Sequence, residues 1–152
     1  MQRIVFFIIS ILLTSCFSNN DPYSNNLGIK SSIVAQLDTA NYTTIFWEDS
    51  VKNFGIIKSR DSILIKFNFK NTGSKPLFIS EVRPSCGCTV VSYPQDLIQP
   101  GKTKTLTATF NTFSYHSGYV RKTINVVSNT KNNTHHYLIF YGEIKDSTDF
   151  NK

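Results

Sequence analysis

The amino-acid sequence predicts an all-β domain made of two facing sheets, and three observations support this prediction. Short runs with alternating apolar and polar side chains recur over residues 43–145, as in strands that have one solvated face. Turn residues separate these runs at regular intervals. No stretch of the region shows a convincing helical period. About seven short strands arranged in this way are typical of a single Ig-like β-sandwich.

The composition agrees with a folded β core. Of the 152 residues, 40% are hydrophobic and 13% are aromatic, with 12 Phe and a single Met. These values argue against a disordered chain and favour a core of rigid side chains. The formal net charge is +6, but Lys and Arg are scattered singly along the strands and form no basic run. We therefore interpret the charges as solvated strand faces and expect no nucleic-acid partner.

The amino end is typical of a bacterial lipoprotein signal peptide. Arg3 gives it a positive start, and residues 4–13 form an apolar run that is too short for a membrane span, which needs about 20 residues. Leu13-Thr14-Ser15-Cys16 then matches a lipobox, in which small residues precede the cysteine that takes the lipid. We predict a signal peptide over residues 1–15 and lipidation of Cys16, including palmitate. An ordinary cleaved signal peptide is the alternative.

A tether is predicted to follow Cys16 and to extend to residue 42. Residues 16–42 contain many polar turn residues, such as SNNDPYSNN, and have no sustained period. About three acyl chains on Cys16, at roughly 0.8 kcal/mol per CH₂, would hold the protein at a membrane. We expect the protein in the cell envelope of a Gram-negative bacterium, on the outer membrane and facing the periplasm. Residues 146–152 are expected to form a C-terminal tail.

The first half of the domain begins with an expected strand over Thr43–Glu48, followed by Phe54–Ile57 along the edge of the sandwich. In residues 63–69, Ile63, Ile65, Phe67 and Phe69 alternate with Leu64, Lys66 and Asn68, which predicts the third strand. A hairpin turn over Asn71–Ser74, in which Gly73 is able to take a positive φ, leads to a strand over Leu77–Val82. The side chains expected to face inward are Ile45, Trp47, Ile63, Ile65, Phe67 and Phe69.

Three longer strands complete the predicted sandwich, over Thr103–Asn111, Tyr119–Val127 and His136–Ile144. A type II turn at Pro100-Gly101 precedes the first of them, and Gly142 would allow a bulge in the last. Lys122 is the one charged side chain at an inward position. The other inward side chains are Leu106, Ala108, Phe110, Val120, Ile124, Val126, His136, Leu138, Phe140 and Ile144.

The stretch FKNTGSKPLFISEVRPSCGCTV, residues 69–90, carries a family resemblance. Its strand, K-N-x-G turn, second strand and S-C-G-C-T resemble a bacterial family of Ig-like domains of unknown function found in secreted lipoproteins. The resemblance covers roughly Thr44–Lys145 and implies a sandwich of the hydin and major-sperm-protein-like group, whose members look like scaffolding modules. It implies no activity. The turn over Lys58–Asp61 departs from the family, which commonly has a glycine there, and we expect a different turn type.

Cys86 and Cys88 flank Gly87, and four roles are open for them. On a strand their Cα atoms would lie roughly 6.6 Å apart on one face, at the upper limit for a disulfide. They could be reduced thiols packed at the end of the sandwich, or a small and easily reduced disulfide in an oxidising envelope. They could also bind a soft metal such as Cu(I), or contact a partner directly. Nothing in the sequence brings His116, His135 or His136 to the pair, so no metal site is assigned.

A loop over residues 113–119 supplies the candidate interface residues Phe113, Tyr115, His116 and Tyr119, unless these side chains simply cover the end of the sandwich. The sequence shows no Gly-rich phosphate loop, Ser-His-Asp set or paired acidic site, so we expect no catalysis and no cofactor. The predicted function is that of a membrane-anchored envelope lipoprotein with an Ig-like module for protein interaction or envelope assembly. The alternative is a thiol-dependent role, in copper handling or redox chemistry, through Cys86 and Cys88.

Overall fold

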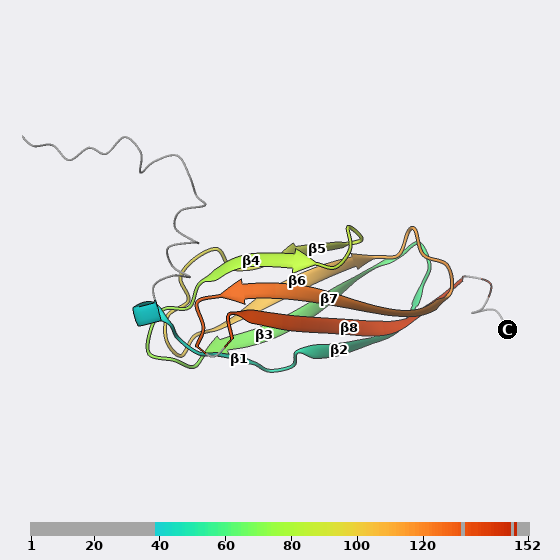
Figure 1. The fold of residues 1–152 in the computed structure, drawn as a ribbon. Helices are drawn as coiled ribbons and strands as arrows, with labels where there is room; N and C mark the ends of the chain where they lie inside the picture. Colours follow the sequence, from blue (N-terminus) through green and yellow to red (C-terminus); the bar gives the residue numbers. More distant parts are fainter. Residues whose placement is uncertain (1–38, 132, 147, 149–152) are drawn as a thin grey trace, which may run out of the picture.

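A computed structural model describes residues 39–131, 133–146 and 148, which form two four-stranded sheets packed face to face (Figure 1). The all-β sandwich expected from the sequence is confirmed. The predicted signal peptide, the lipidation site at Cys16 and the tether up to residue 38 lie outside the described residues. Among the residues that are described, no helix is long and apolar enough to cross a membrane.

Eight strands follow a short 3-10 helix, η2 (Thr39–Asn41). One sheet has the strand order β1-β3-β6-β5 and the other β2-β8-β7-β4. Neighbouring strands are antiparallel except for β2 and β8, which are parallel. The strands are β1 (Ile45–Trp47), β2 (Val51–Lys58), β3 (Ser62–Asn71), β4 (Ile79–Pro84), β5 (Thr89–Ser92), β6 (Thr103–Asn111), β7 (Gly118–Ser128) and β8 (His135–Lys145).

The core lies between the sheets, and most of its side chains were predicted to face inward; Leu77, Ile79, Ile98 and Val127 are further members that were not predicted. Its four fully buried aromatic rings are those of Phe67, Phe69, Phe110 and Phe140, and the centroids of the last two lie 5.4 Å apart. Ile63 and Trp47 are half-buried against this core. Lys122 does face inward, half-buried, and its Nζ lies 5.1 Å from the centroid of the Tyr115 ring. The buried apolar residues are Ile65, Phe67, Phe69, Leu77, Ile79, Ile98, Leu106, Ala108, Phe110, Val120, Ile124, Val126, Val127, Leu138, Phe140 and Ile144.

The hairpin expected over Asn71–Ser74 is wrong. β3 and β4 belong to different sheets, so this segment carries the chain across one end of the sandwich. Gly73 is not among the described residues with a positive φ. Its small size matters instead, because a Cβ at Gly73 would collide with Thr43 Oγ1 and lie 2.6 Å from the backbone N of Thr44. The glycine therefore allows the crossing segment to approach the chain that enters β1.

The buried side chain of Asn71 fixes this crossing. Its Nδ2 donates to the carbonyls of Lys75 and Ile98, each at 2.8 Å. Its Oδ1 accepts from Thr43 Oγ1 at 2.9 Å and from the N–H of Gly73 at 3.1 Å. The amide thereby uses two donors and both acceptor positions, and it connects the start of the domain, the crossing segment and the loop before β6.

Two turns and one bulge were also expected from the sequence. Gly101 has φ +76° and the N–H of Lys102 donates to the Gln99 carbonyl at 3.1 Å, as in the type II turn that was expected. The turn before β3 contains Arg60 at φ 60°, a left-handed conformation without a glycine. The bulge lies on β2 at Phe54 rather than at Gly142. A Cβ at Gly142 would collide with the Phe54 ring, which packs over it.

We predict that Asn71→Ala lowers the free energy of unfolding by about 3 kcal/mol, because it removes four hydrogen bonds, one of them from the buried hydroxyl of Thr43. Urea denaturation, read as a shift in midpoint at constant slope, measures the loss. Asn68→Ala is the matched control. Asn68 lies on the same strand and its side chain bonds to Glu48 and Thr105 at the surface, so its loss should cost less than about 1 kcal/mol. Equal effects of the two substitutions would contradict the role given to Asn71.

We also predict that Gly142→Ala lowers the free energy of unfolding by about 1–3 kcal/mol, since the methyl group overpacks against the Phe54 ring. The ring cannot easily move, because it packs against both Phe110 and Phe140 at centroid distances of 5.9 and 6.3 Å. Gly87→Ala is the control, as a Cβ there meets no atom within 4 Å. It should change stability by no more than about 0.5 kcal/mol in the same urea titration.

Candidate functional site

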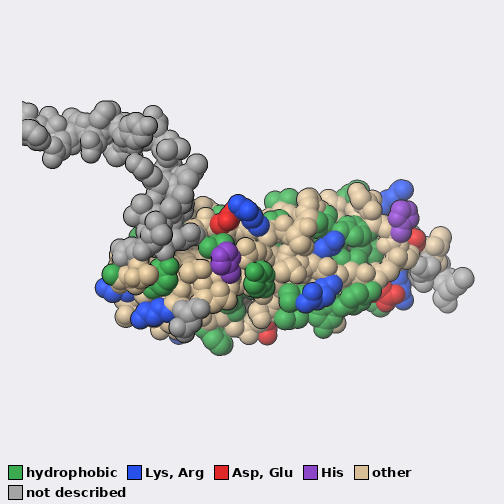
Figure 2. Space-filling view, in the orientation of Figure 1, with side chains coloured by type: hydrophobic (Ala, Val, Ile, Leu, Met, Phe, Trp, Pro, Cys, Tyr) green, Lys and Arg blue, Asp and Glu red, His purple; other side chains and the backbone are tan. Residues whose placement is uncertain are grey.

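The outer face of the β2-β8-β7-β4 sheet carries apolar and aromatic side chains at positions that usually face water. Strand pairing places Val51 beside Ile139, Asn53 beside Tyr141, and Tyr119 beside Glu143. Figure 2 shows hydrophobic side chains gathered over β7 and β8 on this face, with a few Lys and Arg among them. We call this surface the tyrosine face; its apolar members are Val51, Ile56, Tyr119, Tyr137, Ile139 and Tyr141.

A shallow depression lies at one end of the tyrosine face. It has a volume of about 250 Å³ and is lined by Asn53, Gly55, Ile56, Tyr119, Tyr141, Gly142 and Glu143. The rings of Tyr119 and Tyr141 form one wall, with centroids 6.1 Å apart. The volume lies below the roughly 300–1,000 Å³ of most small-molecule sites. The depression therefore suits a protruding side chain of a partner better than an enclosed substrate.

The sequence contained a signal for this face that the prediction did not use. Over residues 137–141, apolar side chains occupy every position, so both faces of the strand are apolar. The inward members are Leu138 and Phe140, which leaves Tyr137, Ile139 and Tyr141 on the outside of an antiparallel pair, where polar side chains are usual. Of the residues predicted for an interface, Tyr119 alone belongs to this face.

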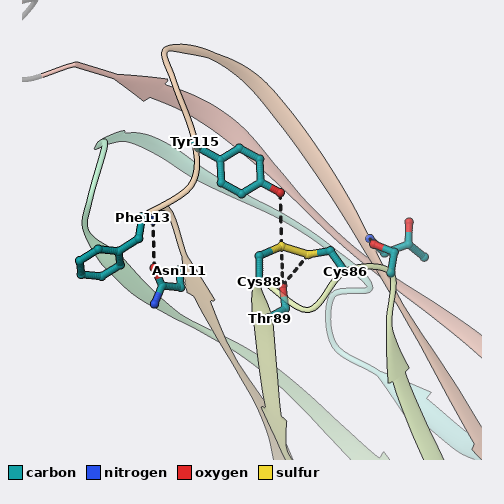
Figure 3. Close-up of a disulfide and its surroundings, with 8 residues drawn as sticks. Cys86, Cys88, Thr89, Asn111, Phe113 and Tyr115 are labelled. Carbon is teal, nitrogen blue, oxygen red and sulfur yellow. Dashed lines mark hydrogen bonds between the residues drawn. A yellow bond between two sulfur atoms is a disulfide. The ribbon is translucent and has the colours of Figure 1, made fainter.

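Cys86 and Cys88 lie in the turn between β4 and β5, where the chain crosses from one sheet to the other, and a disulfide joins them (Figure 3). Their Cα atoms are 5.2 Å apart. The strand geometry assumed from the sequence was wrong, because these residues form a turn in which the N–H of Thr89 donates to the Cys86 carbonyl at 3.4 Å. The turn brings the two Cα atoms well within disulfide range.

Neighbouring strands hold this turn independently of the sulfur atoms. The N–H of Ser85 donates to the Thr123 carbonyl at 2.8 Å, and the N–H of Thr123 donates back to Ser85 Oγ at 3.2 Å. On the other side, the N–H of Asn111 donates to the Cys88 carbonyl at 2.9 Å. Closing so short a loop removes little entropy from the unfolded chain, equivalent to about 1.5 kcal/mol. The disulfide is thus a small contributor to stability.

Two hydroxyl groups surround the disulfide. Tyr115 Oη lies 3.3 Å from Cys88 Sγ, and Thr89 Oγ1 lies 3.5 Å from Cys86 Sγ and 3.9 Å from Cys88 Sγ. Because disulfide sulfurs carry no hydrogen, the hydroxyls are the donors in these contacts. Figure 3 shows the Tyr115 hydroxyl directed at the Cys88 sulfur. Thr89 has one hydroxyl hydrogen and lies nearer to Cys86 Sγ, so Thr89 is the donor to Cys86 and Tyr115 is the donor to Cys88.

Tyr115 is held in this position from two sides. Its ring packs edge-on against Phe110 with centroids 5.4 Å apart, and the Lys122 ammonium lies over it. Its N–H donates to the Thr112 carbonyl at 3.0 Å. The structure thus places this predicted interface residue half-buried beside the disulfide, where it gives the inward Lys122 a partner through a cation–π contact.

The remaining predicted interface residues do not gather on one surface. Phe113 is 64% exposed at the loop, and Figure 3 shows its ring pointing away from the disulfide. His116 is exposed and lies near Asp146. Side-chain hydrogen bonds from Ser59 and Ser117 lower the pKa of Asp146, and the charge of His116 lowers it further.

The two adjacent histidines of β8 lie on opposite faces, as alternation requires. His135 is exposed, whereas His136 is half-buried with its Nε2 3.1 Å from Ser128 Oγ and 2.9 Å from Thr130 Oγ1. Burial lowers the pKa of His136, and the charge of His135 lowers it further. Over the described part of the chain, no three His, Cys, Asp or Glu side chains are grouped so that they could hold a metal ion.

Comparisons with known proteins agree with the fold. A solved protein of unknown function from Porphyromonas gingivalis W83 is similar with a TM-score of 0.60 and 13% identity, over 69% of this chain and 48% of its own. The chain thus spans about half the length of that protein. An ASH / PapD-like domain of human CEP192 is similar with a TM-score of 0.52 and 11% identity, over 70% of this chain and 87% of its own. Both likenesses show the fold alone.

Curated protein sequences yield no significant match. A family model does match: the family described as "Protein of unknown function (DUF1573)" aligns with residues 45–144, which is more than half of the 152 residues. The matched region runs from the start of β1 almost to the end of β8. The chain therefore belongs to this DUF1573 family of unknown function, and its β-sandwich resembles PapD-like and Ig-like domains.

Proposed function

We propose that this protein is an envelope lipoprotein, anchored by lipid on Cys16, whose β-sandwich binds another protein through the tyrosine face. The observation that carries the proposal is the apolar and aromatic outer surface of β2, β7 and β8. Monomeric proteins seldom expose contiguous apolar patches, and patches with polar rims mark interaction sites. The lipobox around Cys16 supports the anchoring part of the proposal.

The chemistry of the tyrosine face suits a protein partner. Tyrosine supplies a large contact area with a polar tip and is enriched among interface anchors. Strand pairing sets Arg121 beside Tyr141 and Glu143 beside Tyr119, so charged groups border the apolar centre. The Lys145 ammonium lies 4.0 Å from Glu143 at the same end. An apolar centre with a charged rim is the usual anatomy of a protein interface.

The opposite face of the sandwich gives the contrast. The outward side chains of β6 are four threonines and Asn111, and those of β3 include Lys66, Asn68 and Lys70. Thr105 donates a hydrogen bond to Asn68 at 2.8 Å across this surface. Its exposed apolar side chains include Phe46, Leu64 and Val90, and each is paired with a polar residue: Phe46 with Lys70, and Leu64 and Val90 with Thr109. This face is solvated in the ordinary way, so the tyrosine face is the better candidate for binding.

The shape of the tyrosine face supports a binding role without catalysis. Its depression is shallow and open, whereas catalytic sites enclose their substrate and exclude water. Within the lining of the depression, Glu143 is the one carboxylate, and no Ser, Cys, Thr, His or Lys side chain accompanies it. The relatives described above give no activity that could be transferred.

Metabolic labelling tests the anchor. Cells grown with an alkyne analogue of palmitate should label the protein, and Cys16→Ser should abolish the label because that thiol accepts the lipid. The double variant Cys86→Ser/Cys88→Ser should keep the label, and with three cysteines in the chain it is the matched control. An unlabelled wild-type protein, or label that persists in Cys16→Ser, would show that the anchor is absent or lies elsewhere.

Photocrosslinking tests the binding face. Benzoylphenylalanine at position 119 should give an adduct of discrete mass in intact cells, whereas the same group at position 46, an exposed aromatic position on the other sheet, should give none. Ile56→Asp should lower the adduct yield at least about tenfold, because loss of an interface anchor costs more than about 1.4 kcal/mol. Leu64→Asp, an exposed aliphatic position on the other sheet, should leave the yield unchanged. Equal adducts from both crosslinking positions would refute the assignment.

A further inference from the structure

We propose that Cys86 and Cys88 form a redox couple that exchanges electrons with a dithiol of another protein, with the Cys88 sulfur leaving as the thiolate. This inference goes beyond the proposed binding function, which requires no thiol chemistry. It rests on three features of the turn between β4 and β5: the accessibility of the disulfide, the unequal surroundings of its two sulfurs, and a backbone frame that does not depend on the S–S bond.

The disulfide is accessible to an incoming thiolate. Both cysteines are half-buried, and Gly87 between them is exposed. A Cβ added at Gly87 would meet no atom within 4 Å, so the turn has open space above it. A disulfide in a packed core would offer no line of attack, and thiol exchange requires one.

The two sulfurs differ in the groups that could stabilise negative charge. Tyr115 donates its hydroxyl to Cys88 Sγ at 3.3 Å, whereas Cys86 Sγ has Thr89 alone, at 3.5 Å. A hydrogen bond to an anion is stronger than one to a neutral sulfur, so the Tyr115 bond strengthens when Cys88 becomes a thiolate. The Lys122 ammonium over the Tyr115 ring adds positive charge nearby and polarises the hydroxyl. Cys88 is therefore the better leaving group.

The exchange then proceeds in two displacements. A thiolate of the partner dithiol attacks Cys86 Sγ, the Cys86–Cys88 bond breaks, and its electron pair goes to Cys88 Sγ. The second thiol of the partner loses its proton and attacks the partner sulfur of the mixed disulfide, which releases the Cys86 thiolate. The partner is oxidised to a disulfide by two electrons, Cys86 and Cys88 are reduced, and the two protons lost by the partner thiols end on the two cysteines.

The turn keeps Cys86 and Cys88 close together after reduction, so that the disulfide can form again. The hydrogen bonds from Ser85 to Thr123 and from Asn111 to the Cys88 carbonyl involve the backbone and no sulfur atom. They therefore persist when the disulfide opens, and the Cα atoms stay within disulfide range. Because the closed loop is so short, opening it releases little chain entropy and the sandwich stays folded.

Equilibration of the full chain with mixtures of reduced and oxidised glutathione tests the couple. After acid quenching and alkylation, intact mass should show the disulfide and dithiol forms together over a range of glutathione ratios. Fluorescence of Trp47, the single tryptophan, should stay unchanged across that range, because the sandwich does not unfold. A disulfide that stays closed in a large excess of reduced glutathione, or that opens only when the fluorescence reports unfolding, would overturn the proposal.

Tyr115→Phe tests the assignment of Cys88 as the leaving sulfur. Loss of the hydroxyl should remove the hydrogen bond that stabilises the departing Cys88 thiolate and slow reduction by glutathione about threefold. Tyr93→Phe is the matched control, since Tyr93 follows the end of β5 that lies away from the turn and packs half-buried against the core, and its rate should equal that of the wild type. A folded Tyr115→Phe protein that is reduced at the wild-type rate would overturn the role given to Cys88.

Discussion

The buried amide of Asn71 is the interaction on which the arrangement of this sandwich depends. β3 ends in one sheet and β4 begins in the other, so the chain must cross the end of the core, and along this crossing Asn71 is buried whereas Thr72, Ser74 and Lys75 are exposed. Buried polar groups without partners are costly. Asn71 donates to the Lys75 carbonyl, accepts from the buried Thr43 hydroxyl, and adds a second bond to the Ile98 carbonyl, which also accepts from the N–H of Leu77. Gly73 complements the amide, because its missing Cβ lets the segment before β1 come close enough for Thr43 to bond to Asn71. The Lys-Asn-Thr-Gly stretch therefore fixes the segment that crosses between the two sheets, and it does not form a hairpin turn.

A second crossing, from β4 to β5, is built on a different principle. The first crossing is held by a side-chain amide in the core, whereas the second is held by backbone bonds from Ser85 and Asn111 to neighbouring strands and carries the disulfide at its surface. Figure 1 places the two crossings at opposite ends of the sandwich. Stability and chemistry therefore belong to different crossings. The buried Asn71 amide stabilises the fold, whereas the turn between β4 and β5 can open its disulfide without loss of the fold.

The sequence predicts those features of the fold that depend on local alternation. Residues 65–69 and 105–111 alternate between apolar and polar side chains, and their apolar members are part of the buried core. Features that depend on distant partners could not be predicted. Turn residues at 71–74 look the same for a hairpin and for a sheet crossing, and β5 is too short to show a period. Tyr115 lies 27 positions from Cys88, so its contact with the sulfur leaves no sequence signal. The lipid site at Cys16 lies outside the described residues and stays a prediction.

The tyrosine face and the disulfide turn share strand β7. Arg121 points outward beside Tyr141 on the tyrosine face, and the next residue, Lys122, points inward to the ring of Tyr115 beside Cys88. Thiol exchange between two proteins is slow when it depends on random encounter, and it is accelerated when binding raises the effective concentration of the reacting groups. A partner held on the tyrosine face by contacts that are unaffected by oxidation would gain this advantage at the turn. Because the binding contacts and the sulfur atoms lie on separate surfaces, the disulfide can change its redox state while the binding contacts stay intact.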